Sequence, residues 1–417
     1  GNSMKKAIAV FLCIMLTTGM ISGCAGREQG ADSSGENTAA EENKEDQDAQ
    51  TEEGQETEEE AGEDGQKSEE QDQQETDAEE TDGSQEETQD RDMTEDLAMS
   101  VLKDQAGTVD YTSLEELNPE PGIRIAVVLK SAIDDFWTTV REGIEDGVEA
   151  LNEKMGYTGE DQITVSFDAP SSDTDVEKQI DLIDTVLSEN PSILCIAAID
   201  RQSCEAQLEM AAENDIPVVM IDSGVERGPI SALCATDNYK AGTEAARRLA
   251  EAIGDDGQIA VMAHTESAQT SQDREKGFTD EIAKNHPNIE IVNISHENEE
   301  FTMDKMADAV FTLYPDVKGY FCTNEAASEA VLTAANAAGK EIAVVGFDSG
   351  ETQQKAVNDG TETGFIAQNP YGMGYAAAIA GVRADLGLSV DTFIDTSYQW
   401  IDSNNIDNEE YSSYFYG

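Results

Sequence analysis

Short apolar runs alternate with helix-type patterns along most of this chain, starting at residue 123. The run 123–129 is typical of a buried strand, and the apolar residues from Phe136 to Met155 recur three and four positions apart, as on a helix face. Further strands are predicted at 163–167, 193–199, 217–221, 258–262, 289–294, 319–322, 342–347 and 364–367. Helices are predicted between or after them, near 175–189, 203–214, 239–253, 271–285, 302–314, 326–338, 351–359 and 371–386.

This alternation of strands and helices predicts an α/β protein with parallel sheets covered by helices on both faces. Two sheets accommodate the number of strands better than one. The folding part of the chain starts near residue 121, which leaves close to 295 residues, enough for two lobes of ordinary size.

The first residues have the pattern of a secretion signal. Met4-Lys5-Lys6 is followed by an apolar stretch from Ala7 to Met15, which is too short for a comfortable membrane span. The stretch leads to Ile21-Ser22-Gly23-Cys24, which resembles a bacterial lipobox and implies that Cys24 carries the acyl chains of a membrane anchor. The alternative is an ordinary signal with an incidental cysteine. Residues 1–24 are thus read as a lipoprotein signal, with a cloning remnant before Met4.

Residues 25–120 are polar and acidic and are predicted to be a disordered linker. Between Ala25 and Asp96 there are 30 acidic residues, 4 basic residues and no aromatic residue. Such a segment buries too little apolar surface to offset its ordering entropy, and self-repulsion extends it. The formal net charge of −64 for the whole chain also argues against nucleic-acid binding, which needs a basic face.

The polar side chains that come just after the predicted strands are the candidates for a site, because ligands of open parallel sheets bind beyond the carboxyl ends of the strands. These positions, with the start of the first helix, are Lys130, Asp134, Phe136, Trp137, Asp222, Asn324, Phe347, Asp348 and Gln368. Charged and amide groups suit the hydroxyls of a polyol, and flat rings suit the apolar face of a sugar.

Sequence motifs across residues 122–405 resemble the ribose-type periplasmic-binding-protein family, type I. Among the most specific are IAVVLKSAIDDFW (125–137), TSQDREKGF (270–278) and VVGFDSGETQQKAVNDG (344–360). The resemblance implies two similar Rossmann-like lobes joined by a three-stranded hinge, with a sugar between them, and it adds Arg274 to the site. The lobes are then expected to comprise 121–236 plus 369–396, and 237–368 plus 397–417.

Several of these residues have alternative roles. Asp134, Asp222 and Asp348 are also suited to be N-caps of the helices that follow them, which is a common use of Asp. One of Phe136 and Trp137 is expected to belong to the core rather than the site. Arg274 has the alternative of a solvated helix face with acidic neighbours.

Neither a cofactor nor a metal is expected. The four cysteines of the folding part, Cys195, Cys204, Cys234 and Cys322, show no metal-ligand spacing, and the three histidines are scattered. Cys195 and Cys322 lie inside apolar runs, which favours buried free thiols over disulfides, and the sequence does not decide whether any of the four pair. There is no P-loop and no G-x-S-x-G motif, and the loose G-x-G-x-x-A at 372–377 follows an interrupting Asn369-Pro370. The sequence therefore predicts a binding protein and not an enzyme.

The resulting hypothesis is a lipid-anchored, monomeric receptor on the outer face of a bacterial cytoplasmic membrane. It captures a small sugar or polyol by lobe closure and delivers it to the permease of an ABC importer. One alternative is a sensor that presents the sugar to a membrane kinase or chemoreceptor. Another is a receptor for an acidic sugar held by Lys130 and Arg274; a neutral sugar is favoured, because the predicted site holds three carboxylates against two cations.

Overall fold

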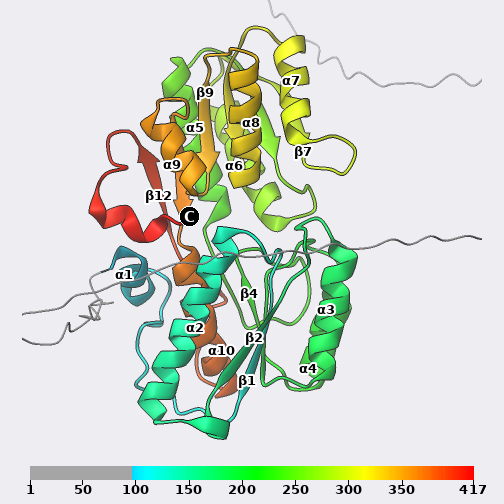
Figure 1. The fold of residues 1–417 in the computed structure, drawn as a ribbon, viewed down its shortest axis with the longest axis vertical. Coiled ribbons are helices and arrows are strands. Elements are labelled where there is room, and N and C mark those ends of the chain that lie inside the picture. Colours follow the sequence, from blue (N-terminus) through cyan, green and yellow to red (C-terminus); the bar gives the residue numbers. More distant parts are fainter. Residues whose placement is uncertain (1–95) are drawn as a thin grey trace, which may run out of the picture. The chain divides into compact units, whose positions relative to one another are not determined.

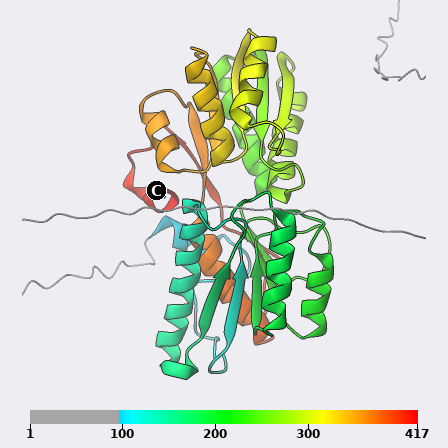
Figure 2. The same cartoon turned by 45° about the vertical axis from the view of Figure 1, so that its right-hand side comes forward.

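The computed structural model describes residues 96–417, which lie within one compact unit, Glu86–Gly417. The predicted signal, Cys24 and the linker up to residue 95 lie outside the described residues. Two sheets, each covered by helices on both faces, form two lobes (Figures 1 and 2). The predicted α/β fold class with two parallel-sheet lobes is therefore confirmed. No helix within residues 96–417 combines the length and the apolarity that crossing a bilayer requires.

The first lobe contains a six-stranded parallel sheet with the order β11-β5-β4-β3-β1-β2. Its strands are β1 (Arg124–Val128), β2 (Thr164–Asp168), β3 (Ile193–Ile196), β4 (Val218–Ile221), β5 (Ala232–Ala235) and β11 (Phe393–Asp395). Ile125 and Val127 pack toward α2 (Asp135–Met155) and α10 (Pro370–Asp385). Ala126 and Val128, on the opposite face, pack toward α3 (Val176–Ser188) and α4 (Glu205–Glu213). Burial on both faces explains why these strands read as continuous apolar runs.

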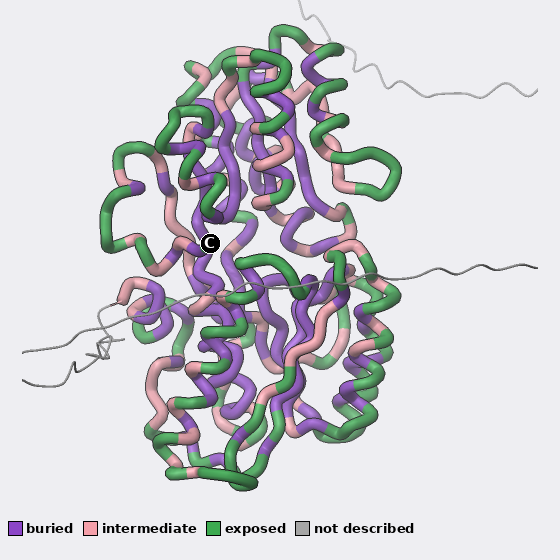
Figure 3. The backbone as a smooth tube through the Cα atoms, in the orientation of Figure 1, coloured by how far each residue is buried: buried purple, intermediate pink, exposed green. Residues whose placement is uncertain are grey.

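The second lobe repeats this plan with the order β12-β10-β9-β8-β6-β7, and only β12 is antiparallel to its neighbour. Its strands are β6 (Gly257–Ala263), β7 (Ile289–His296), β8 (Val317–Cys322), β9 (Ala343–Phe347), β10 (Gly364–Gln368) and β12 (Tyr398–Asp402). One face packs on α5 (Asn238–Ile253) and α6 (Gln269–Asn285), and the other on α7 (Met303–Leu313) and α8 (Glu325–Ala337). The helix α9 (Glu351–Asn358) follows β9. The central strands of both sheets are buried, whereas the edge strands β2, β7, β11 and β12 are partly exposed (Figure 3).

Each lobe contains a pair of helices that approach closely through glycine. A Cβ at Gly374 of α10 would lie 2.0 Å from the carbonyl oxygen of Val140 in α2. A Cβ at Gly242 of α5 would lie 2.1 Å from the carbonyl oxygen of Arg274 in α6. The G-x-G-x-x-A pattern at 372–377 therefore serves helix packing in α10.

Three short segments cross between the lobes, at 236–237, 369 and 396–397, and hydrogen bonds join them. Thr236 Oγ1 donates to Gln368 Oε1 at 2.7 Å. The Thr396 amide donates to the Ala235 carbonyl at 3.0 Å, and Asn369 Nδ2 donates to the Thr396 carbonyl at 3.2 Å. The predicted three-stranded hinge is present, and its bonds align it with the ends of β5 and β10.

The structure corrects the expected extent of the linker, because residues 96–120 are folded. The helix α1 (Leu97–Asp104) and the segment after it bury Met99, Leu102, Tyr111 and Leu117 in the first lobe. Asp391 fixes this segment by accepting hydrogen bonds from Thr108 and Tyr111. The prediction missed these few apolar residues because it rested on the acidic average composition of the whole segment. The sequence also missed β5, β11 and β12, and two short 3-10 turns, η1 (Gly159–Asp161) and η2 (Glu409–Tyr414).

The four cysteines of the described residues are free and buried. Burial raises the pKa of the Cys195 and Cys204 thiols to about 12. The expectation of buried free thiols is confirmed for Cys195 and Cys322, and Cys204 and Cys234 are unpaired as well.

Candidate ligand-binding site

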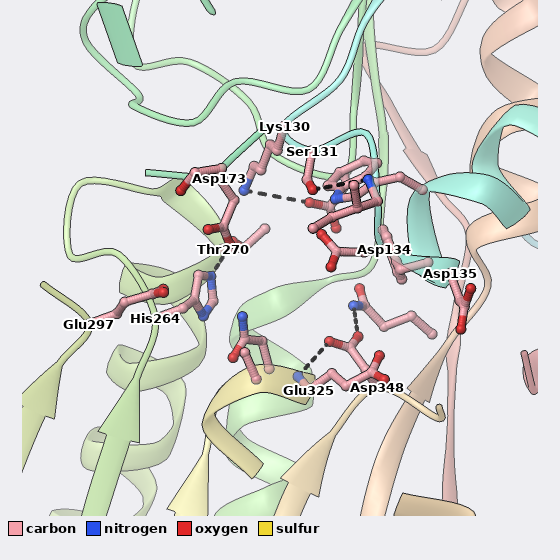
Figure 4. Close-up of a pocket in the computed structure, with 18 of the residues that line it drawn as sticks. Lys130, Ser131, Asp134, Asp135, Asp173, His264, Thr270, Glu297, Glu325 and Asp348 are labelled. Atoms are coloured by element: carbon pink, nitrogen blue, oxygen red, sulfur yellow. Dashed lines mark hydrogen bonds and ion pairs between the residues drawn. The ribbon is translucent and has the colours of Figure 1, made fainter. Parts of the chain in front are cut away.

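A cavity of about 430 Å³ lies between the lobes, at the carboxyl ends of the strands (Figure 4). In each sheet the strand order reverses on either side of the first strand of the lobe, β1 or β6, and such a reversal leaves a crevice for a ligand. The cavity is lined by nine of the ten predicted site residues, namely Lys130, Asp134, Phe136, Trp137, Asp222, Arg274, Asn324, Asp348 and Gln368. The tenth, Phe347, is fully buried and does not line it. That these residues bind a ligand stays a prediction.

Arg274 is held from three sides in the second lobe. Its side chain is almost completely buried, and Nε donates to Asn238 Oδ1 at 2.9 Å. The two terminal nitrogens donate to the Thr323 carbonyl at 2.7 Å and to Gln368 Oε1 at 3.0 Å. The guanidinium also lies over the Phe347 ring, 3.7 Å from its centroid. The alternative prediction, that Arg274 lies on a solvated helix face, is therefore wrong. Two of the five N–H groups of its guanidinium take no part in these hydrogen bonds.

Asp348 and Gln368 extend this network. Gln368 Nε2 donates to Asp348 Oδ1 at 2.5 Å, and the Glu325 amide donates to Asp348 Oδ2 at 3.0 Å. Burial raises the pKa of Asp348, and the nearby Arg274 charge opposes that rise. Asp348 is not the N-cap of α9, which is Gly350, but satisfies the first amide of α8.

Asn324 is the N-cap of α8, because its Oδ1 accepts from the Ala327 amide at 2.9 Å. This bond leaves the two N–H groups of the Asn324 side chain available on the side of the cavity. Asn324 therefore caps α8 and lines the cavity at the same time.

Lys130 and Asp222 come from the ends of β1 and β4 in the first lobe. Lys130 is 6% exposed, and its Nζ lies 3.8 Å from Asp222 Oδ2. Asp222 also lies 3.9 Å from Arg274 of the other lobe. Among residues 96–417 Lys130 Nζ has no hydrogen-bond partner. Burial lowers its pKa, while the Asp222 charge raises it.

Phe136 and Trp137, at the start of α2, both belong to the core of the first lobe and both line the cavity. Their ring centroids lie 4.9 Å apart at an interplanar angle of 83°. The ring centroid of Tyr416 lies 6.0 Å from that of Phe136, and the Tyr416 hydroxyl donates to Glu325 Oε2 of the second lobe at 3.1 Å. Asp134 occupies the N-cap position of α2 but makes no capping hydrogen bond, so its carboxylate is free to face the cavity.

Sequence reasoning missed several residues that line the cavity, chiefly Asp173, His264, Thr270, Glu297 and Glu325. His264 and Glu297 follow β6 and β7 directly, but the predicted strands ended one and two residues too early. Correct strand ends would have found both. Asp173 lies in the loop five residues after β2, and no local pattern marks it.

The cavity is strongly acidic. Seven carboxyl groups line it, against the two cations Lys130 and Arg274. Burial raises the pKa of Glu297 to about 7, with Asp173 adding to the rise, and raises that of Glu325 to about 8, with Asp348 adding to it. His264 has both ring nitrogens within 2.7 Å of the hydroxyls of Thr323 and Thr270, and burial holds its pKa well below the usual value. Nowhere in residues 96–417 do three or more His, Cys, Asp or Glu side chains form a group able to hold a metal ion.

Comparison with known proteins gives a consistent result. Residues 125–384 match the family described as periplasmic binding protein domain. The chain is 24% identical over 259 residues to the ribose import binding protein of Bacillus subtilis, covering 61% of this chain and 79% of the relative. Two solute binding proteins from Agrobacterium vitis, solved with D-fucose and with α-D-tagatopyranose, are each 26% identical. Their TM-scores are 0.63 and 0.65; the matches cover 70% and 71% of this chain, and 100% and 99% of those chains.

Proposed function

Because the chain belongs to the periplasmic binding protein family, we propose that it is a receptor which captures a small sugar or polyol between its lobes for an ABC importer. The observation that carries this proposal is the cavity itself, which both lobes line with hydrogen-bonding groups beside two aromatic rings. Sugars bound to the similar Agrobacterium vitis proteins support the ligand class. The role is binding and not catalysis.

Ligand capture is proposed to proceed by closure of the lobes about the hinge. Contacts that a ligand makes with both lobes at once stabilise the closed state over the open one. Gln368 is well placed to couple ligand binding to lobe closure, since it lines the cavity and its Oε1 also accepts a hydrogen bond from Thr236 in the hinge. A permease would then recognise the closed form.

The ligand is not proposed to be an acidic sugar. Lys130 and Arg274 both lie near Asp222, and six further carboxyl groups line the same cavity. An added carboxylate or phosphate would place still more negative charge in a site of low polarity, at a high electrostatic cost. The function of Lys130 is therefore to offset the repulsion between Asp222 and its acidic neighbours.

A thermal-shift screen of the full chain over pentoses, hexoses, polyols and sugar acids tests the proposal. A ligand that binds only the folded state at 100 times its Kd stabilises it by about 2.7 kcal/mol, so Tm rises by several degrees. A rise with neutral sugars or polyols is expected. A rise confined to sugar acids, or no rise with any compound, would contradict the proposed ligand class.

The receptor is further proposed to be anchored at the outer face of the cytoplasmic membrane through acylated Cys24. Support comes from the lipobox-like sequence Ile21-Ser22-Gly23-Cys24. Cys24→Ser expressed in a suitable bacterium should shift the protein from the membrane fraction to the medium, as measured by immunoblotting. Membrane association that persists in this variant and needs detergent for release would exclude the anchor.

A further inference from the structure

Two carboxyl groups from opposite lobes face one end of the cavity. Asp173 follows β2 and Glu297 follows β7, and these strands are the edge strands at equivalent positions in the two sheets. Both side chains line the cavity, on the same side as Lys130 and His264 (Figure 4). Lobe closure therefore brings two acidic groups toward each other.

Neither carboxyl group forms an ion pair in the described part of the chain, although the Lys130 charge acts to lower the pKa of both against the rise that burial causes. Among residues 96–417 no Lys or Arg nitrogen lies within 4.0 Å of Asp173, Glu297 or the nearby Asp134, and Lys130 is paired with Asp222. The Oε2 atom of Glu297 is buried and accepts no hydrogen bond. The buried Lys130 ammonium, which has no hydrogen-bond partner among these residues, points to a ligand that supplies an acceptor beside it. The cavity thus has an unmatched donor next to unmatched acceptors.

We propose that the ligand is an amino sugar or amino polyol whose ammonium group lies between Asp173 and Glu297. This inference rests on the proposed function and specifies the substrate class of the same site. An ammonium has three donors and one positive charge, so it joins carboxylates of both lobes by charge-assisted hydrogen bonds. Hydroxyl groups of the same ligand serve as acceptors for Lys130 and for the unused N–H groups of Arg274.

Other occupants fit these residues less well. A metal ion needs several ligating groups converging on one point, and the described residues contain no such group. An anionic ligand would add to the excess of carboxyl groups. A neutral sugar leaves Asp173 and Glu297 facing each other on closure without a charge between them.

Calorimetric titration of the full chain at pH 7.5 tests the inference with matched compounds. These are amino hexoses, their N-acetyl derivatives, the parent neutral hexoses, and an amino polyol with its parent polyol. At least one amine should bind about tenfold or more tightly than its neutral parent, and N-acetylation should remove that preference, since it removes the charge. For the amino polyol the preference should grow between pH 6 and 8, because Glu297 ionises near pH 7 while the amine stays protonated.

Variants assign the effect to these two residues. Asp173→Asn and Glu297→Gln should each bring the ratio of amine to neutral affinity down toward one. Glu299→Gln, at an exposed position in the same loop as Glu297, is the matched control and should keep the ratio. Neutral compounds that bind as tightly as amines would overturn this inference and leave the proposed function standing. An unchanged ratio in both variants would also overturn it, whereas failure of every sugar and polyol would overturn the proposed function itself.

Discussion

The two halves of the cavity are built differently. In the second lobe, Arg274, Gln368, Asp348 and Asn324 are tied to one another or to backbone groups by hydrogen bonds of 2.5–3.0 Å. In the first lobe, Lys130 has only an ion pair at 3.8 Å, and Asp134 makes no capping bond. Ordering side chains on binding costs free energy, and the second lobe has already met that cost during folding. We therefore expect a ligand to dock on the second lobe and the first lobe to close over it.

The largest expected effect comes from breaking the ordered half with Arg274→Ala. This variant should weaken binding of any ligand found in the screen by about 100-fold or more, because charged hydrogen bonds contribute about 1.5–3 kcal/mol each. It should also lower the free energy of unfolding by about 3–5 kcal/mol, since it leaves buried partners unpaired. Calorimetry and urea unfolding measure the two losses.

The control is Arg247→Ala on α5, an exposed arginine whose ion pair with Glu281 should contribute less than about 1 kcal/mol. Full stability in Arg274→Ala would mean that the hydrogen bonds of the second lobe do not order the site in advance.

In the first lobe the hydrogen bonds of Gln179 join the chain after β1 to the chain after β3, but the side chains of Lys130 and Asp134 take no part in them. Residues 96–117 pack on the core of the same lobe and are expected to stabilise it. Removing residues 25–95 should leave Tm within about 1 °C, whereas removing residues 25–117 should lower it by about 5–10 °C. The longer deletion loses Met99, Leu102, Tyr111 and Leu117, and each buried side chain contributes about 1.5–3 kcal/mol. Calorimetric scanning of both truncations decides the point. Equal Tm values would show that this segment does not brace the lobe.

A smaller effect is expected from Lys130→Met in the unordered half. Binding should weaken by about tenfold, measured by calorimetry, because the ammonium is lost as a donor to the ligand. Tm should fall slightly, because the variant leaves Asp222 with only one of its two nearby cations, a loss that is partly offset by removing the cost of burying the Lys130 charge. A loss of stability as large as in Arg274→Ala would mean that the pair of Lys130 and Asp222 orders the first lobe as well.

The smallest expected effect is a pH dependence of stability from Glu325 at the boundary of the two halves. Its pKa is raised from 4.5 to about 8 by burial, so the folded state keeps a proton that the unfolded state releases between these values. Stability therefore falls as pH rises from about 5 to 8. Glu325→Gln should reduce this fall by a few degrees of Tm, whereas Glu213→Gln, at an exposed position on α4, should not. An identical fall in Glu325→Gln would exclude Glu325 as its source.

Much of the fold could be predicted because its strands are buried on both faces. Such strands appear as apolar runs, and the predicted ends of most helices lie within one or two residues of those in the structure. The strand β5 was missed because its four residues, Ala-Leu-Cys-Ala, include no β-branched or aromatic residue, and β11 has only three residues. The helix α1 was missed because a short apolar stretch follows a long acidic one.

The same reasoning explains what could be predicted of the site. Lys130, Asp222 and Asp348 directly follow apolar runs, so chain position alone identifies them. The bonds that orient Arg274 could not be foreseen, because Asn238, Thr323 and Gln368 come from three separate elements. The place of Asp173 in the cavity depends on the path of a loop, and a loop path leaves no periodic pattern in the sequence.

The burial of the four described thiols also determines how this protein can be labelled. With pKa values near 12, Cys195 and Cys204 present almost no thiolate to a maleimide dye at neutral pH. In a chain with Cys13 and Cys24 replaced, Ala132→Cys and Glu299→Cys would then take a donor and an acceptor fluorophore at exposed positions on opposite lobes. Energy transfer between them would follow closure in single molecules and would make the receptor an optical sensor of its own ligand.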